Sequence, residues 1–497
     1  MMKYLSVLLM FLGSAACAAE LEFREPALVP MPTKVTFEKN TEVRLKDGMK
    51  VVLVCSEDGK VWVEDRFAKW FGVKPTVAID NTVRSAPSRT GAYGLKVSPD
   101  RIEICASSLL GVKYAMYTLR QAAERLSEGV TLQGYHLAAM EVSDAPELDF
   151  RALHVCWFPE ESATQVEHQI RQAAYYKFNY VILESWGVFR SERHPGLCVE
   201  NAPLTVAEAH RLAALARDLG VTIIPQVNIF GHASMSRGSV GKHVALDVHP
   251  ELQPLFEPQS GWNWCLSNPA ARAVVRDLAD EVHAAFDRPE YFHLGCDEAD
   301  APSCAKCRAA KPYASLVAQH IREAHDMFAK KGVQTLMWHD MLLERGDKRW
   351  QGLVANGSRD EAAMLKDLPK DMIICDWYYD GPREDYPSLD YFTTNGFRTV
   401  TCSWNNLEGV VAQGKFAREH KLFGFMETLW HHYRGQEFVE MMRLSAQAAW
   451  NGKEPCGSVW CNPFATHWRQ TGWDQGIRDW REHGYNDGQV TRDILDK

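Results

Sequence analysis

Two adjacent carboxylates, Asp297 and Glu298, stand directly after the short apolar run Tyr291–Leu294. An apolar run of this kind predicts a buried strand, and acids at its end are typical of general acid–base chemistry, because strand–helix barrels hold catalytic groups at the carboxyl ends of strands. Neighbouring residues on a regular strand point to opposite faces, so both acids can serve one site only if the strand breaks at Cys296. Gly295 makes such a break feasible.

The elements that would position these acids alternate between strand and helix from residue 146 onward. Such alternation implies a parallel sheet with helical crossovers, and eight rounds predict an α/β fold with a closed (β/α)8 TIM barrel over residues 146–452. The predicted strands are Ala152–Val155, Asn179–Leu183, Thr222–Gln226, Tyr291–Leu294, Gln334–Trp338, Met372–Trp377, Arg398–Cys402 and Leu422–Glu427. The predicted helices are Gln165–Lys177, Val206–Leu219, Asn268–Phe286, Ala314–Lys330, Ser358–Lys366, Pro387–Thr393, Leu407–Glu419 and Glu437–Trp450.

Residues 20–145 have a different pattern, with short β segments and one helix, Leu110–Leu126. Strands covered on one face by a helix predict a small α+β domain in front of the barrel. The polar tail 453–497 is rich in tryptophan and is expected to pack on the barrel.

The net charge of −9 argues against nucleic acid or an anionic membrane as the main partner. No segment has the roughly 18 consecutive apolar residues that a membrane-spanning helix needs. Residues 1–19 combine Lys3, a short apolar run and small residues, which predicts a signal peptide and an exported, periplasmic or extracellular protein. Lipid attachment at Cys17 is the alternative to ordinary cleavage near Ala19. The sequence carries no indication of the oligomeric state.

Cys304 and Cys307 form a CxxC motif just past the acids. This motif suits a metal knuckle, a redox pair or two ordinary loop cysteines. A structural zinc site needs four ligands, and no second CxxC is present, while Cys456 and Cys461 have the wrong spacing. The sequence therefore leads us to expect no metal.

The residues from His293 to Glu298 read His-Leu-Gly-Cys-Asp-Glu. Together with Ser267-Asn268-Pro269 and the helix that follows, they resemble the signature of glycoside hydrolase family 20, the β-N-acetylhexosaminidases. The cysteine at position 296 is closest to the hexosaminidase D branch. Residues 92–121 also resemble the family's non-catalytic amino-terminal domain.

The resemblance implies an exo-hydrolase that removes terminal, non-reducing β-linked N-acetylglucosamine or N-acetylgalactosamine from glycans. In this family the substrate's own acetamide attacks the anomeric carbon, and configuration is retained. Asp297 would stay ionised and orient the acetamide, while Glu298 would protonate the leaving oxygen and then activate water. Burial and neighbouring groups should raise the proton affinity of Glu298. No cofactor is required.

The resemblance also implies binding residues at other strands. Arg151, at the entry to the first strand, would hold ring hydroxyls with its planar fork of donors. His232 ends the family's Ile-Pro-Glu-to-Gly-His pattern, in which this chain has Gln226 for Glu, and would sit beside Glu298. Glu184 would be either a supporting carboxylate or a sugar ligand.

Aromatic residues follow the later strands and would wall the sugar pocket. The family's acetamide-gripping tyrosine has no match at the seventh strand, so Tyr378 or Tyr379 is expected to replace it. His432 stands where many members have the Glu that contacts the sugar O4, which leaves the preference between the two sugars open. The candidate wall residues are Trp338, Trp377, Trp404 and Trp430.

Two alternatives stay open. The departures at Gln226, Gly187 and His432 would also suit a protein that binds amino-sugar glycans without cleaving them, although the intact pair of Asp297 and Glu298 favours the enzyme. The other alternative is a relative that releases a disaccharide.

Overall fold

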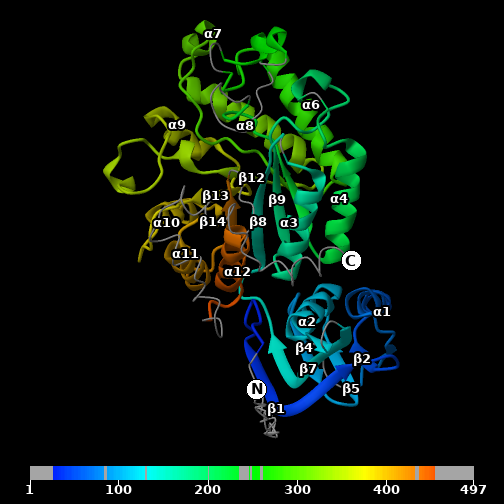
Figure 1. The fold of residues 1–497 in the computed structure, drawn as a ribbon. Helices are drawn as coiled ribbons and strands as arrows, with labels where there is room; N and C mark the ends of the chain where they lie inside the picture. The colour runs from blue at the N-terminus through cyan, green and yellow to red at the C-terminus, as the bar shows by residue number, and fades with distance from the viewer. Residues whose placement is uncertain are drawn as a thin grey trace, which may run out of the picture.

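The computed structural model of the chain describes residues 26–82, 87–128, 131–159, 161–199, 201–233, 246, 249–257, 261–430 and 436–453. The predicted signal peptide and all but the first residue of the predicted tail lie outside these ranges. A small sheet domain is followed by a closed barrel (Figure 1), which confirms the predicted fold class. Within the described ranges, no helix has the length and apolar character needed to cross a membrane.

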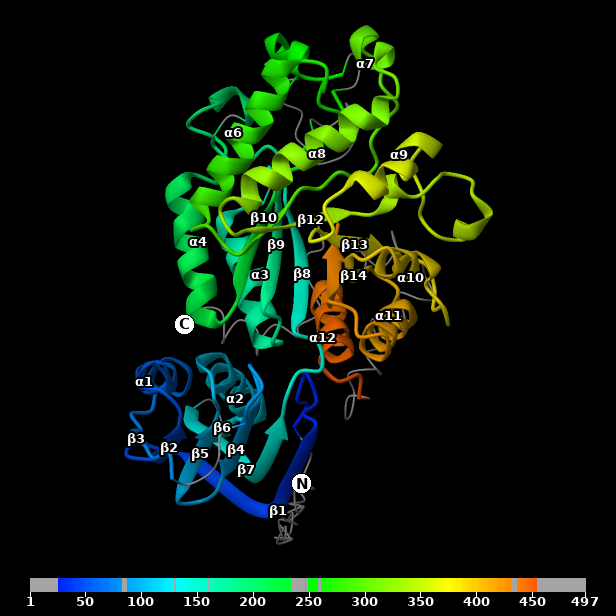
Figure 2. The same cartoon turned by 180° about the vertical axis from the view of Figure 1, so that it is seen from behind.

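The amino-terminal domain is a seven-stranded mixed sheet whose two helices, α1 (Glu57–Phe71) and α2 (Leu109–Ala122), lie between the sheet and the barrel (Figures 1 and 2). The strands run in the order β1-β7-β4-β5-β2-β3, and β6 pairs with β7. Their bounds are β1 Lys34–Leu45, β2 Lys50–Val54, β3 Thr76–Ile79, β4 Tyr93–Val97, β5 Arg101–Cys105, β6 Glu124–Glu128 and β7 Thr131–Asp144.

Helix α2 corrects one prediction. It begins after Ser108, whose side chain caps the helix by accepting a hydrogen bond from the backbone N–H of Gly111. It ends at Ala122, because Ala123 is extended and the following residues pair with β7 as strand β6. The predicted helix Leu110–Leu126 is therefore wrong in its last turn, and α1 was not predicted.

The barrel consists of eight parallel strands that close in the order β8 to β15. All eight predicted strands and the eight helices between them are present, although the fifth helix is short and continues as a 3₁₀ turn, η5 (Met364–Asp367). The strands are β8 Phe150–Trp157, β9 Tyr180–Ser185, β10 Thr222–Gln226, β11 Tyr291–His293, β12 Gln334–Trp338, β13 Ile373–Trp377, β14 Arg398–Ser403 and β15 Gly424–Leu429. The helices are α3 Ala163–Tyr175, α4 Val206–Leu219, α6 Pro269–Ala285, α8 Tyr313–Ala329, α9 Arg359–Ala363, α10 Pro387–Thr394, α11 Leu407–Glu419 and α12 Gln436–Trp450, with a short α7 (Ala305–Ala309) before α8.

Side chains fill the inside of the barrel, as is usual for this fold. At the amino end, Phe150 stacks on Tyr180 at 4.6 Å between ring centroids, and Tyr291 packs edge-on against both. Nearer the carboxyl ends of the strands, Trp338 is completely buried and closes the barrel core beneath the carboxyl-end residues. A site is therefore open only toward the loops that follow the strands.

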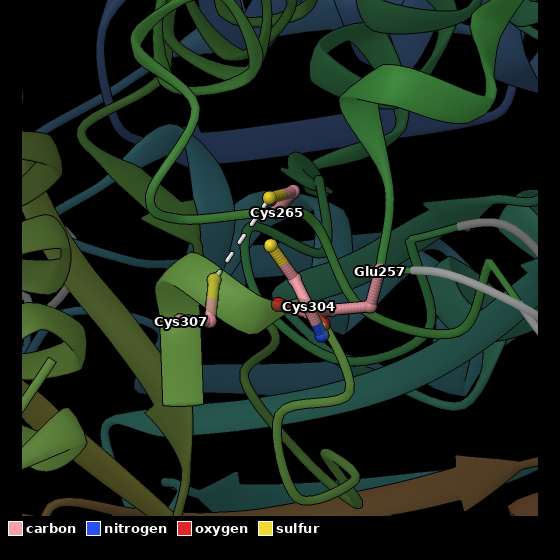
Figure 3. Close-up of side chains that lie close together, drawn as sticks. All are labelled: Glu257, Cys265, Cys304 and Cys307. Atoms are coloured by element: carbon pink, nitrogen blue, oxygen red, sulfur yellow. Dashed lines mark hydrogen bonds between the residues drawn. The ribbon is translucent and has the colours of Figure 1, made fainter. Parts of the chain in front are cut away.

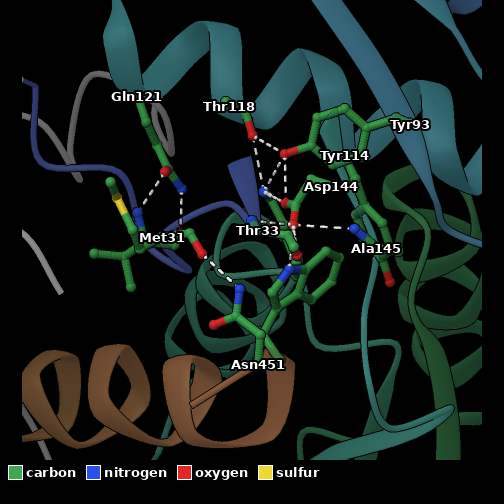
Figure 4. A network of polar contacts seen from close by, with 12 residues as sticks. Met31, Thr33, Tyr93, Tyr114, Thr118, Gln121, Asp144, Ala145 and Asn451 are labelled. Carbon is green, nitrogen blue, oxygen red and sulfur yellow. Dashed lines mark hydrogen bonds and ion pairs between the residues drawn. The ribbon is translucent and has the colours of Figure 1, made fainter. Parts of the chain in front are cut away.

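A buried polar network joins the two domains (Figure 4). Asp144, at the end of β7, accepts hydrogen bonds from Tyr93 Oη at 2.8 Å and from Trp450 Nε1 of α12 at 2.9 Å. Lys177 Nζ lies 3.6 Å from the Asp144 carboxylate and donates to Tyr93 and Thr118, both at 2.8 Å. Burial lowers the pKa of Lys177 to about 8, although Asp144 favours its charged form. The network ties the sheet domain to the barrel, as expected for buried charges that are paired.

Candidate active site

The two acids lie on a tight loop at the carboxyl end of the fourth barrel strand. Strand β11 ends at His293, and Gly295, Cys296 and Glu298 follow with positive φ of 67°, 79° and 44°. Only glycine fits at position 295, because a Cβ there would lie 1.8 Å from Asn228 Oδ1. The predicted break in the strand is confirmed, and it lies one residue earlier than Cys296.

The loop brings both carboxylates to one histidine. His232 Nε2 lies 3.2 Å from Asp297 Oδ2 and 3.3 Å from Glu298 Oε2. His232 itself has a positive φ of 53°, and Gly231 before it approaches so closely that a Cβ would lie 2.2 Å from the carbonyl oxygen of Asp297. The structure thus places Asp297, Glu298 and His232 together, as the sequence analysis expected.

The two acids have different surroundings. Asp297 is only 5% exposed, and its Oδ1 receives no hydrogen bond from the described residues. The Glu298 side chain is 47% exposed. The protein without substrate therefore leaves Glu298 accessible, and the burial expected for it would have to come from the bound substrate.

Asp340, which was not predicted, supports the loop that carries Asp297 and Glu298, called the acid loop below. It follows β12, is completely buried, and its Oδ2 accepts hydrogen bonds from Glu298 N and Asn356 Nδ2, both at 2.9 Å. Burial and the negative charge of Asp297 raise the pKa of Asp340 to about 6. Its position one residue past Trp338-His339 at a strand end was the sequence signal that could have identified it.

Trp262, which was likewise not predicted, contacts the acid loop on its other side. Its Nε1 donates to the backbone oxygen of Glu298 at 2.6 Å, and its ring centroid lies 4.2 Å from that of His232. Because it belongs to a loop between β10 and α6 with no regular pattern, nothing in the sequence distinguished it from a core tryptophan.

The contacts of Glu184 bear on its two predicted roles. It is buried at the end of β9, where Oε2 contacts His154 Nε2 at 2.9 Å and Oε1 accepts from Asn228 Nδ2 at 2.7 Å. Burial opposes its ionisation, but the hydrogen bond and charge of His154, with His232 and Asn228, lower its pKa below the ordinary value. Both oxygens are engaged, which favours the first of its two predicted roles.

The predicted aromatic wall forms a connected cluster above Trp338. Tyr379 stacks on Trp377 at 4.9 Å and meets Trp404 edge-on at 5.2 Å, while its hydroxyl accepts a hydrogen bond from Trp430 Nε1 at 2.6 Å. Trp377 Nε1 also reaches Asp340 Oδ1 at 3.4 Å, which connects the wall to the acid loop. Trp377, Tyr379, Trp404 and Trp430 are half-buried.

Two predicted binding residues lie elsewhere. Arg151 is near the start of β8, at the amino end of the barrel, and its guanidinium donates to Tyr114 Oη and to the carbonyl oxygens of Leu148 and Lys177. It is 2% exposed at the domain interface, so the structure contradicts a role in sugar binding.

Tyr378 packs outward against Tyr386 at 5.7 Å, so of the two candidate tyrosines only Tyr379 faces the site. His432 lies outside the described residues.

Paired carboxylates and a histidine at the carboxyl end of a (β/α)8 barrel, next to a wall of aromatic rings, define the class of barrel proteins to which many sugar-processing enzymes belong. The model of "Glycosyl hydrolase family 20, catalytic domain" matches residues 166–451, and that of "Glycosyl hydrolase family 20, domain 2" matches residues 25–145. The chain belongs to glycosyl hydrolase family 20.

Relatives and solved structures agree with this assignment. The chain is similar to a β-hexosaminidase of Vibrio furnissii, with 24% identity over 389 residues, which cover 68% of this chain and 61% of the relative. It is also similar to a β-N-acetylhexosaminidase of Cellulomonas fimi, with 26% identity over 48% of this chain and 49% of the relative. The chain thus spans less than two thirds of the length of these relatives.

Among solved structures, the fold is similar to that of a family 20 exo-β-N-acetylglucosaminidase from Vibrio harveyi in complex with N-acetylglucosamine. The TM-score is 0.66 at 18% identity, and the match covers 88% of this chain and 75% of the other. A β-N-acetylhexosaminidase from Bacteroides fragilis matches with a TM-score of 0.65 at 17% identity, covering 89% and 94% of the two chains.

Proposed function

We propose that the protein is an exo-β-N-acetylhexosaminidase that hydrolyses terminal, non-reducing β-linked N-acetylglucosamine or N-acetylgalactosamine from glycans. The observation that carries this proposal is the unequal environment of the paired acids. A buried carboxylate with one oxygen unoccupied suits a fixed negative charge that receives an N–H group, and an accessible carboxyl beside it suits proton exchange with a leaving group and with water.

In the proposed mechanism, Asp297 Oδ1 accepts a hydrogen bond from the acetamide N–H of the substrate. The acetamide oxygen is thereby directed at the anomeric carbon, as in the substrate-assisted variant of retaining glycosidases. Positive charge then develops on the cyclised acetamide, and the carboxylate of Asp297 stabilises it in a site from which water is largely excluded.

Tyr379 is the group that we assign to the acetamide oxygen. Burial raises its pKa well above the ordinary value, so the hydroxyl keeps its proton at all physiological pH values. Because Trp430 Nε1 already donates to this hydroxyl, the hydroxyl proton can point toward the substrate. Half-buried Trp377, Trp404 and Trp430 would pack against the sugar ring and its N-acetyl methyl.

Glu298 protonates the leaving oxygen in the first step and deprotonates the attacking water in the second. His232 lies within 3.3 Å of the Glu298 carboxyl and orients it. The hydrogen bond from the backbone N–H of Glu298 to Asp340 fixes the loop. The substrate's leaving group would cover the exposed side of Glu298, which disfavours the charged form of the acid at the moment when it must donate.

We also propose that the protein acts outside the cytoplasm, on the basis of the signal-like residues 1–19. Sequencing the amino terminus of the mature protein recovered from the periplasm or medium tests this. A new terminus near Glu20 would support ordinary cleavage, a lipid-modified Cys17 would support anchoring, and an intact Met1 in the cytoplasm would refute export.

The activity is tested with chromogenic β-N-acetylglucosaminide and β-N-acetylgalactosaminide, using the wild type, D297N and E298Q. D297N is expected to abolish turnover and E298Q to reduce it only in part, because a chromogenic leaving group needs no proton; the ratio of the two substrates gives the sugar preference. E290Q is a suitable control, because Glu290 is an exposed carboxylate at the opposite end of the same strand, where it accepts from Tyr180. No turnover by a folded wild type that still binds the sugars would refute the exo-enzyme and favour a glycan-binding protein, and release of a disaccharide from a longer glycan would identify the third alternative.

A further inference from the structure

Four side chains behind the acid loop converge on one point (Figure 3). Glu257 and Cys265 belong to the loop between β10 and α6, while Cys304 and Cys307 lie at the start of α7, after β11. One ligand atom from each, the three sulfurs and a carboxylate oxygen, lie within 4.8 Å of one another. A CxxC spacing pattern does not reveal this cluster, because the two added ligands are single residues about 40 to 50 positions earlier in the chain.

The spacing of the sulfurs suits a metal better than a disulfide. Cys265 Sγ and Cys307 Sγ are 3.8 Å apart. Two thiolates bound to one tetrahedral zinc at about 2.3 Å would be roughly 3.8 Å apart, whereas sulfurs in a disulfide are about 2.05 Å apart. Figure 3 shows the sulfurs of Cys265, Cys304 and Cys307 facing a common centre, as ligands of one ion do.

Hydrogen bonds orient Glu257 so that it can act as the fourth ligand. It is 3% exposed, and its Oε2 accepts hydrogen bonds from Ser303 N at 2.9 Å, Ser303 Oγ at 3.1 Å and Cys304 N at 2.5 Å. Its other oxygen, Oε1, is buried and receives no hydrogen bond from the described residues. Such outer contacts commonly orient a metal-ligating carboxylate, and a buried, unpaired carboxylate oxygen is otherwise costly.

The surroundings of two of the thiols also suit metal binding. Cys307 is completely buried and Cys265 is 6% exposed, so bulk water does not compete for them. Ser267 Oγ donates a hydrogen bond to Cys307 Sγ at 2.7 Å, which fixes the position of the sulfur. Three sulfurs and one carboxylate make up the four ligands of a tetrahedral site, and both are ligand types that zinc binds.

We propose that Glu257, Cys265, Cys304 and Cys307 form a structural zinc site. The ion would join the loop that carries Trp262 to the loop that carries the paired acids. The two loops already meet through Asn263, whose side chain donates to and accepts from the backbone of Asp300 at 2.7 and 3.1 Å. Zinc would lock this contact and so hold the loops around Glu298 in place. This proposal is independent of the proposed substrate.

The test is the metal content of the purified full-length protein, measured by inductively coupled plasma mass spectrometry. About one zinc per chain is expected in the wild type, and none in the double variant C304S/C307S. The matched control is C55S/C105S, which removes two cysteines from the amino-terminal domain and should keep the zinc. Zinc that persists in C304S/C307S, or stoichiometric iron or copper in place of zinc, would overturn the assignment.

A second measurement on the wild type covers the case in which C304S/C307S does not fold. Cobalt(II) is exchanged into the site, and its absorption spectrum is recorded. Intense visible bands of a tetrahedral ion, with thiolate-to-cobalt charge-transfer bands in the near ultraviolet, are expected. A weak octahedral spectrum, or an intact mass lower by two hydrogen atoms than that of the fully reduced chain together with absence of metal, would show unliganded cysteines or a disulfide and refute the site.

Discussion

Glu427 provides the most direct test of the energetics of this barrel. It lies on β15, is completely buried, and one carboxylate oxygen accepts hydrogen bonds from Ser403 and Ser445. Burial raises its pKa from 4.5 to about 8, and the two serines offset only part of this effect. The folded protein thus holds this proton more tightly than the unfolded chain does.

The sign of the effect on stability follows from this difference. A raised pKa contributes stability that is fully present below about pH 4.5 and is lost as the pH rises toward 8, because the unfolded chain ionises first. At pH 7 the loss is about 3 kcal/mol, since each pKa unit is worth about 1.4 kcal/mol. With an unfolding entropy of roughly 2 cal/mol/K per residue, or about 1 kcal/mol/K for a chain of this size, this amounts to about 3 °C in Tm.

The substitution E427Q removes the titrating group. The amide adds a constant cost, because its NH2 group meets a buried position without a described partner, but that cost does not depend on pH. Part of the loss is already present at pH 5, so the fall in Tm between pH 5 and pH 7 should be about 2–3 °C smaller in E427Q than in the wild type. Scanning calorimetry at constant ionic strength measures the fall, and the infrared band of protonated carboxyls at pH 7 should lose the contribution of Glu427 in E427Q, while buried Asp376, whose pKa burial raises to about 7, still contributes.

The control is E419Q, which removes a carboxylate that is 61% exposed on α11 and should follow the wild-type profile. Parallel pH profiles of E427Q and the wild type would refute the argument, because they would mean that Glu427 ionises equally in the folded and unfolded states.

Three further predictions concern the site and the domain interface. E298Q should lower kcat/KM for a disaccharide by roughly 10²- to 10⁴-fold, but much less for an aryl glycoside whose leaving group needs no proton; equal losses on both would count against an acid role. Y379F, which removes the hydroxyl that accepts from Trp430, should raise KM for N-acetyl sugars by about tenfold with an unchanged circular dichroism spectrum, and an unchanged KM would exclude contact with the acetamide. K177M should lower the free energy of unfolding by about 3–5 kcal/mol, because Asp144 stays buried without its cation; an unchanged melting temperature would contradict this pairing.

Asp340 explains why the acid loop can keep an unusual backbone. Positive φ at a non-glycine residue such as Glu298 costs free energy, so the surrounding structure must compensate. The hydrogen bonds from Glu298 N to Asp340 and from Trp262 to the Glu298 carbonyl oxygen supply that compensation on both sides of the residue. The loop is thus held by side chains from the loop after β10 and from the segment after β12 as well as by its own sequence.

The sequence by itself determined the order and type of the barrel elements. Hydrophobic periodicity is a local property, and each strand and helix had to bury one face whatever its neighbours were. For the same reason the glycine-assisted break before Asp297 and Glu298 was visible in the sequence, since it depends on a few consecutive residues. The missed helix α1 and the wrong last turn of α2 lie in the sheet domain, where pairing with β7 decided the conformation of residues from Glu124 onward.

Only the tertiary structure decided which polar side chains share a site. Arg151 and Glu184 both belong to barrel strands, yet the first lies at the amino end against the other domain and the second at the carboxyl end near His232. Tyr378 and Tyr379 are neighbours in the chain but face opposite sides of the barrel wall. Glu257 and Cys265 reach Cys304 and Cys307 only because two loops meet. Such encounters depend on the closure of the barrel and the packing of its loops, which are non-local and leave no periodic signal in the sequence.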